Sequence, residues 1–161
     1  MVLLTLLQCN KLHERLPSLV HFPSSPEYQE RHSTYYALQQ RELFPACTVK
    51  PASTEDVSQI LEFAEASHCQ FAVASGGHMA WKGASNIDEG FVVDLRGLNM
   101  IEIVPSEHTA KLGPGSTWQS VYKEMVPYNL TVAGARISEV GVGGFLAGGK
   151  SYPVQTFYIY S

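Results

Sequence analysis

The chain has 161 residues, of which 45% are hydrophobic and 16% are charged, so its composition is that of a globular domain rather than of a disordered segment. The formal net charge is −4 and no run of lysine and arginine is present, which excludes the basic surface that a nucleic-acid-binding domain needs. The basic residues are spread thinly, so nothing predicts a basic amphipathic helix at a membrane surface.

The first nine residues, Met1–Cys9, form a mostly apolar run. The run is too short to span a membrane and no basic residue precedes it, so it is a poor signal peptide. We expect a first helix with one buried face instead. The compartment stays open: the cytoplasm, or the secretory pathway if a signal peptide has been lost.

Three cysteines, Cys9, Cys47 and Cys69, are present without a C-x-x-C motif. Their spacing does not decide which of them pair. Two alternatives follow from the residues: a Cys9–Cys69 bridge between the N-terminal segment and the glycine-rich half, or three buried thiols.

The polar segment from Pro17 to Pro45 is punctuated by prolines, and Pro23–Pro26 is typical of a turn. We predict an extended, irregular arm, which together with the first helix makes an N-terminal unit of residues 1–45. The side chains expected to anchor this arm are Tyr28, Tyr35, Tyr36, Leu38 and Phe44.

Regular structure is predicted from residue 46 onward. Cys47–Val49 reads as a short strand, and Ser53 followed by acidic residues has the pattern of a helix start. Apolar residues at helical spacing carry this helix to about Ser67. Phe71–Ala74 is then a short buried strand that runs directly into the sequence Ser-Gly-Gly-His.

The second half continues the alternation of strands and helices, which predicts an α+β fold with α/β-like order. Residues 91–95 form a strand, and residues 100–104 and 109–112 form a hairpin around a polar turn. Ser116 and Gln119 match a capping box at the start of a helix. Residues 130–133 are expected to form the next strand, and the domain is expected to span 46–151, followed by a divergent tail at 152–161.

Glycine is confined to one part of the chain: all 13 glycines lie at or after Gly76. They gather in two segments, Ser75–His78 and Gly141–Gly149. Consecutive backbone N–H groups without side-chain obstruction form a nest that suits a pyrophosphate, and His78 closes the first segment. The alternative for the first segment is a glycine turn with an exposed histidine.

The second glycine segment matches two nucleotide-binding patterns only in part. The position of the third glycine in a dinucleotide fingerprint is occupied by Leu146, and no convincing strand precedes it. Residues 144–151 match the letters of a Walker loop, but Pro153 follows where a long helix is required. We therefore reject both interpretations.

No metal site is predicted, because the remaining histidines show no ligand spacing. These histidines are His13, His21, His32, His68 and His108. No serine, histidine and aspartate set and no cysteine and histidine set has the context for nucleophilic catalysis.

Four sequence segments occur in the order seen in one known family. They are Pro51–Val57, Phe71–His78 (FAVASGGH), Gly90–Asn99 and Val140–Gly149 (VGVGGFLAGG). On these segments the chain resembles the FAD-binding domain of the berberine-bridge-enzyme-like oxidases, which have the vanillyl-alcohol-oxidase (PCMH-type) fold. It is most similar to the fungal FAD-linked oxidoreductases of secondary metabolism.

This resemblance implies an FAD site built from both glycine segments. His78 matches the histidine that, in many members, is bonded covalently to the 8α-methyl carbon of the flavin. The family's disulfide implies a bridge between Cys9 and Cys69. The positions that match cofactor-binding residues are Ser75, Gly76, Gly77, His78, Met79, Ala84, Ser85, Gly141, Val142, Gly143, Gly144, Gly148 and Gly149.

The resemblance also implies a reaction: hydride transfer from a small organic substrate to the flavin, followed by reoxidation by molecular oxygen. Members of the family continue for hundreds of residues with a substrate domain and a catalytic residue that have no counterpart here, so no catalytic base is named. Lys150 and the residues after Ser151 depart from the family pattern. The alternative is a truncated, non-catalytic relative with weak or no flavin binding.

Overall fold

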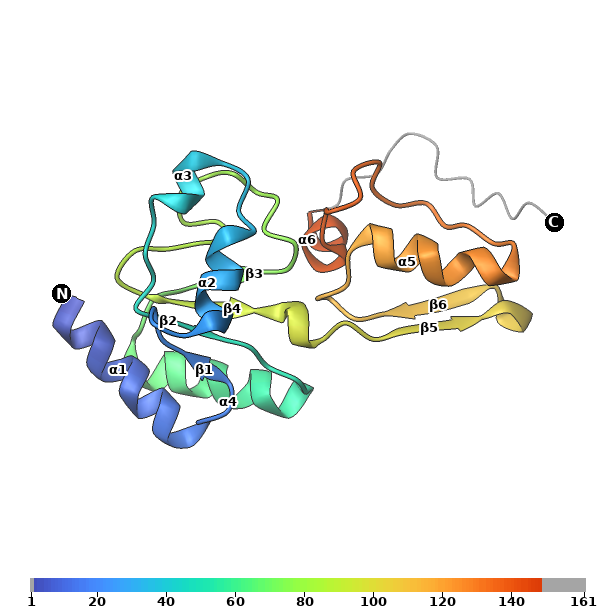
Figure 1. The fold of residues 1–161 in the computed structure, drawn as a ribbon. Helices are drawn as coiled ribbons and strands as arrows, with labels where there is room; N and C mark the ends of the chain where they lie inside the picture. The colour runs from blue at the N-terminus through green and yellow to red at the C-terminus, as the bar shows by residue number, and fades with distance from the viewer. Residues whose placement is uncertain (1, 149–161) are drawn as a thin grey trace.

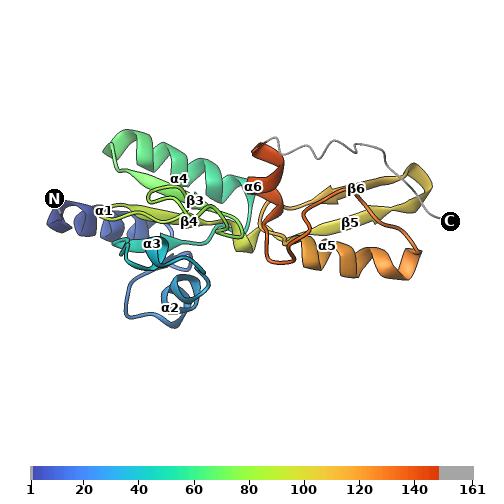
Figure 2. The same cartoon turned by 90° about the horizontal axis from the view of Figure 1, so that it is seen from above.

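The computed structural model describes residues 2–148 and shows two lobes joined end to end (Figures 1 and 2). The sheet lobe comprises residues 2–98 and the hairpin lobe comprises residues 99–148. Gly149, Lys150, Ser151 and the predicted tail at 152–161 lie outside the described residues. None of the helices within residues 2–148 is both long and apolar enough to cross a membrane.

The sheet lobe is built on four strands in the order β1-β2-β4-β3, with β1 antiparallel to β2 and the other neighbours parallel. The predicted strands at 47–49, 71–74 and 91–95 and the predicted helix from 54 to 67 are confirmed. The strands are β1 (Val20–His21), β2 (Cys47–Val49), β3 (Phe71–Ala74) and β4 (Phe91–Asp94), and the helices are α1 (Val2–Arg15), α2 (Pro26–Ser33), α3 (Leu38–Arg41) and α4 (Thr54–Ser67).

Helices cover both faces of this sheet: α1 and α4 pack on one face, and α2 and α3 lie on the other (Figure 1). Successive residues of a β-strand point to opposite faces of the sheet, so the side chains of β4 contact the two helical layers in turn. Phe91 and Val93 join the core with α1 and α4, whereas Val92 packs with Ala72 and Ala74 on the other face. The sheet is therefore buried on both sides, as a parallel sheet requires.

The predicted disulfide is wrong. The structure joins Cys9 on α1 to Cys47 at the start of β2, and Cys69 is a buried free thiol. All three cysteines are buried in the same apolar core, so burial does not indicate which two of them form the bridge. The pair is selected by the packing of α1 across β2. Burial raises the pKa of the Cys69 thiol, which keeps it neutral.

The segment predicted as an irregular arm is ordered, which is a second correction. It contains β1 and the two helices α2 and α3. Ser25 caps α2 by accepting a hydrogen bond from the backbone N–H of Tyr28, with Pro26 at the first helical position. The serine and proline of the expected turn are thus a helix start. Tyr28 is buried and donates to the Pro45 carbonyl oxygen, and burial raises its pKa to about 12.

The hairpin lobe consists of a two-stranded antiparallel sheet with helices beside it. The predicted hairpin is confirmed, with Ile101 opposite Leu112 and Val104 opposite Thr109. Its elements are β5 (Ile101–Val104), β6 (Thr109–Leu112), α5 (Trp118–Met125) and α6 (Val142–Ala147), with short 3-10 turns η2 (Pro105–Glu107) and η3 (Val126–Tyr128). A further 3-10 turn, η1 (Leu95–Gly97), follows β4 at the end of the sheet lobe.

Two details of this lobe differ from the sequence prediction. The cap of α5 is Thr117, paired with Ser120, one residue after the predicted pair of Ser116 and Gln119. The predicted strand at 130–133 does not form. Leu130 and Val132 pack instead against the apolar cluster around α5. Their apolar side chains therefore belong to a connecting segment that is packed on a helix, and not to a hydrogen-bonded β-strand.

We expect Cys9→Ser to lower the free energy of unfolding by about 2–4 kcal/mol, because the bridge closes a loop with a sequence separation of 38 and so restricts the unfolded chain. Cys69→Ser is the matched control, which removes a buried sulfur but leaves the bridge intact and is expected to cost less. Urea denaturation measures both variants. Peptide mapping without reductant should recover a linked Cys9–Cys47 pair, and a Cys9–Cys69 pair would contradict the structure.

Candidate functional site

The two glycine segments, far apart in sequence, lie backbone against backbone at the junction of the lobes. A Cβ atom added to Gly76 would lie 2.7 Å from the Glu139 carbonyl oxygen and would clash with the backbone nitrogen of Gly141. Ser75 secures the contact, since its hydroxyl donates to the Pro114 carbonyl oxygen at 2.6 Å. Glycine is needed at both positions because no side chain fits between these two segments.

The carbonyl groups of the first glycine segment are held by side chains from the N-terminal helices. Arg31 Nη1 donates to the Ser75 carbonyl oxygen at 3.3 Å. Gln40 Nε2 donates to the carbonyl oxygens of Gly77 and Met79, at 2.7 and 3.0 Å. In a trans peptide, the C=O of one residue and the N–H of the next point in opposite directions. Each of these contacts therefore turns an N–H group away from the side chain that holds the carbonyl.

The N–H groups of Gly76 and His78 are turned away in this manner, and the Tyr36 hydroxyl, which donates to the His78 carbonyl oxygen, turns the Met79 N–H away likewise. Within residues 2–148, the backbone N–H groups of Gly76, His78 and Met79 donate no hydrogen bond. Unpaired N–H groups on successive residues form a site for an anion. Donors of this kind are what the pyrophosphate nest predicted from the sequence requires.

A buried cation lies beneath this nest. Arg31 is 1% exposed, its Nη1 lies 4.0 Å from Asp94 Oδ1, and its guanidinium stacks over the ring of Tyr35 at 4.6 Å. Gly77 adopts a left-handed conformation with φ of +72°, and an added Cβ would clash with Arg31 Nη2. That Nη2 atom has no hydrogen-bond partner among the described residues. The positive charge thus lies directly under the glycine turn.

Asp94 also binds a second arginine. Arg96 Nη2 lies 2.7 Å from Asp94 Oδ2, and Arg96 Nη1 lies 3.1 Å from Glu30 Oε1. The network therefore joins the end of β4 to helix α2. Burial raises the pKa of the neighbouring Tyr35 hydroxyl, so the tyrosine stays protonated and donates to the Ser85 carbonyl oxygen.

His78 lies beside an aromatic ring and an acidic residue. Its imidazole is 4.8 Å from the ring of Tyr36, centroid to centroid, and the Tyr36 hydroxyl donates to the His78 carbonyl oxygen. Hydrogen bonds from the Ser138 side chain and from its own backbone lower the pKa of the Glu139 carboxyl, and the nearby His78 lowers it further. The carboxylate is therefore ionised and close enough to His78 to interact with it.

A cavity of about 300 Å³ opens between the two segments. Of the predicted site residues, His78 and Met79 line it from the first segment and its continuation, and Gly144 and Gly148 line it from the second. Helix α6 lies at this junction (Figure 1). The lining residues are His78, Met79, Ala135, Arg136, Ile137, Val140, Gly144, Phe145 and Gly148.

The other predicted residues occupy supporting positions. Val142 is 1% exposed and donates its N–H to the Ser116 carbonyl oxygen, so its side chain belongs to the core. Gly143 donates its N–H to the Pro114 carbonyl oxygen. Ser85 is buried against Gln40, while Ala84 is exposed at the outer end of the first loop. Gly149 lies outside the described residues.

The second glycine segment is a short helix rather than a loop. Helix α6 begins at Val142 after the N-cap Gly141 and ends at Ala147. The first four residues of the Walker-like match are therefore helical, and an isolated bridge from Gly141 to Thr117 precedes them in place of a strand. This geometry agrees with the rejection of a Walker loop.

Sequence reasoning missed the residues that support the first loop. Arg31, Gln40 and Asn86 are almost fully buried polar side chains, and Asn86 Nδ2 donates to the carbonyl oxygens of Gln40 and Leu43. Arg31 and Gln40 come from the segment predicted to be an irregular arm. No sequence motif predicts their role, because it depends on a contact with a loop that lies far away in the sequence.

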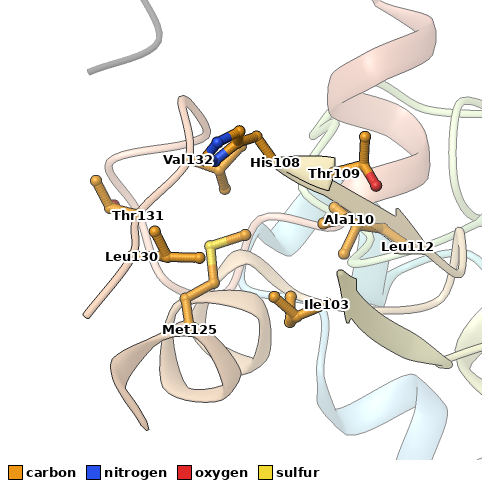
Figure 3. Close-up of a pocket in the computed structure, with 9 residues that line it drawn as sticks. All are labelled: Ile103, His108, Thr109, Ala110, Leu112, Met125, Leu130, Thr131 and Val132. Carbon is orange, nitrogen blue, oxygen red and sulfur yellow. The ribbon is translucent and has the colours of Figure 1, made fainter. Parts of the chain in front are cut away.

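A second cavity, of about 460 Å³, lies at the far end of the hairpin lobe (Figure 3). Apolar side chains from the hairpin, α5 and the following segment form most of its wall, with His108 and two threonines at its edge. None of the predicted site residues lines it. Across residues 2–148, no group of three or more histidine, cysteine, aspartate or glutamate side chains is placed to hold a metal ion.

Comparison with known proteins identifies relatives of this chain. A family model described as FAD binding domain matches residues 45–159. The chain is 40% identical to an FAD-dependent monooxygenase of Cochliobolus heterostrophus over 129 residues, which cover 80% of this chain and 25% of that protein. It is 38% identical to an FAD-dependent monooxygenase of Emericella nidulans over 145 residues, which cover 89% of this chain and 30% of that protein.

Solved structures share the fold. The chain matches 6-hydroxy-D-nicotine oxidase from Arthrobacter nicotinovorans with a TM-score of 0.65 and 25% identity over 76% of this chain and 26% of that one. It matches the berberine-bridge-enzyme-like protein 28 of Arabidopsis thaliana with a TM-score of 0.74 and 22% identity over 89% of this chain and 29% of that one. The chain thus spans between a quarter and a third of the length of these relatives.

We expect Gly76→Ala to lower the free energy of unfolding by about 2–3 kcal/mol, because its Cβ would force the two glycine segments apart. Gly144→Ala is the matched control: its Cβ would meet nothing within 4 Å, and alanine is favoured over glycine in a helix by about 0.5–1 kcal/mol. Thermal unfolding of both variants checks the prediction. Equal stability of the two variants would show that the segments are not in contact.

Proposed function

The chain belongs to the family of FAD binding domains and its cofactor is FAD, and from this premise we propose that it forms the cofactor-binding part of an oxidoreductase of fungal secondary metabolism. The observation that carries the proposal is the meeting of both glycine segments at one cavity, with His78 at its edge and unpaired N–H groups beside it.

The residues present fit FAD. The unpaired N–H groups of Gly76, His78 and Met79 are suited to the pyrophosphate, which needs donors more than it needs free cations. Buried Arg31 adds a positive charge beneath the nest without reaching the surface. Gly144 and Gly148 expose their backbone on the opposite wall of the cavity, beside the side chain of Phe145, so a flat ring system can approach the main chain at these two positions.

When bound, FAD would supply a flavin ring able to take up a hydride from a small organic substrate and to return the electrons to molecular oxygen. The chain's own residues orient this cofactor. We assign to His78 the covalent attachment at the 8α-methyl carbon, supported by its position at the cavity edge. This covalent bond would prevent loss of the cofactor and would raise its reduction potential.

The substrate-binding surface and the acid–base residue belong to the remaining length of such a protein. Relatives of this chain are named FAD-dependent monooxygenases, and a similar solved structure is an oxidase. Reoxidation by oxygen is common to both chemistries, so this part of the proposal does not depend on which of them the whole protein performs.

We expect the purified chain to retain a flavin absorption band in the pellet after acid precipitation. In His78→Ala, the flavin should move to the supernatant, because only the covalent bond is removed. His108→Asn is the matched control, since this histidine is exposed and in a left-handed conformation that asparagine tolerates. A colourless protein, even after refolding with excess FAD, would instead identify a relative without a working cofactor site.

A further inference from the structure

We propose that Gln40 is a positioning residue that fixes the orientation of His78, with Tyr36 as its second support. The proposal rests on the proposed function only where flavin is the readout, because the geometry itself concerns the chain alone. Both residues come from the short segment that ends with helix α3, and neither belongs to a glycine segment.

The Gln40 amide donates to both sides of His78. Its Nε2 atom lies 2.7 Å from the Gly77 carbonyl oxygen and 3.0 Å from the Met79 carbonyl oxygen. A third acceptor, Ser85 Oγ, lies 2.7 Å away. The amide has two protons for these three acceptors, so it is shared among them and cannot turn without losing all three contacts.

Tyr36 completes the support. Its hydroxyl donates to the carbonyl oxygen of His78 at 3.3 Å, so three successive carbonyl groups are held by two side chains. The peptides on both sides of His78 are then fixed, and with them the direction of its Cα–Cβ bond. The Tyr36 ring, tilted by 32° against the imidazole, restrains the remaining rotation of the side chain.

Within residues 2–148, the Gln40 side chain acts only as a hydrogen-bond donor. Gln40 is 0% exposed, and its Oε1 atom has no hydrogen-bond partner among the described residues. An apolar side chain of the same size would remove the donor from the Gly77 and Met79 carbonyl oxygens and from Ser85 Oγ, and an unsatisfied buried acceptor opposes folding. The amide serves as a donor, and the groups that receive its hydrogen bonds are the ones that set the direction of His78 and of the N–H groups in the nest.

The chain contains its own control. Gln39 is adjacent on α3 but exposed, so Gln39→Met and Gln40→Met make the same chemical change on the outside and the inside of one helix. The first measurement is the imidazole resonance of His78 in the full chain without cofactor, recorded by NMR with labelled histidine. The Tyr36 ring shifts this resonance, so it reports the distance between the two rings.

We expect Gln40→Met to move the His78 resonance toward its unstructured value, to weaken FAD binding about tenfold and to lower the fraction of acid-stable flavin. Gln39→Met should leave all three unchanged. An unchanged His78 resonance and acid-stable fraction in a folded Gln40→Met variant would overturn the proposal while leaving the proposed function intact. If the parent chain takes up no FAD, the proposed function fails, and the His78 resonance alone still decides whether Gln40 positions it.

Tyr36→Ala keeps the test decisive if Gln40→Met does not fold. Tyr36 is 57% exposed, so its removal leaves the core intact, and Tyr128→Ala, from a residue that is 50% exposed, is the control. Tyr36→Ala should shift the His78 resonance and lower the acid-stable flavin fraction, and Tyr128→Ala should do neither. If Tyr36→Ala behaves like its control, the support assigned to these two side chains is wrong.

Discussion

A guanidinium buried under a glycine turn is the interaction on which the site depends. Arg31 is removed from water, so its charge must be met inside the protein, and Asp94, the Tyr35 ring and the Ser75 carbonyl meet it from three different parts of the chain. These partners lie at the end of β4, in the segment after α2 and at the end of β3. One buried charge thus ties the N-terminal helices to the carboxyl ends of β3 and β4, and the first glycine segment follows β3 directly.

The junction of the lobes follows from a second constraint, which is the space that side chains would occupy. Gly76 and Gly141 bring the two backbones so close together that neither position accepts a Cβ. The cavity beside them is lined from both lobes, with His78 on one side and Gly144 and Phe145 on the other. A cofactor bound there would contact both lobes, so its binding is coupled to the way the lobes pack.

Local sequence signals predicted several elements well. The hydroxyl and acidic residues at Ser53 and Asp56 mark the start of α4, and alternating apolar residues mark the hairpin. The same kind of reasoning failed where one signal has two meanings. A serine followed by proline at 25–26 begins a helix as readily as a turn, and the apolar residues at 130–133 pack without forming a strand.

The sequence by itself determined the α+β class and the two glycine segments, since glycine, strand and cap patterns act over a few neighbouring residues. His78 became the candidate attachment point only through the resemblance of these segments to a known family. Only the tertiary structure decided that Cys9 pairs with Cys47, and that Arg31 and Gln40 hold the first glycine segment. These contacts join residues far apart in the chain. Their formation depends on how α1, α2 and α3 pack on the sheet, and no local pattern encodes that packing.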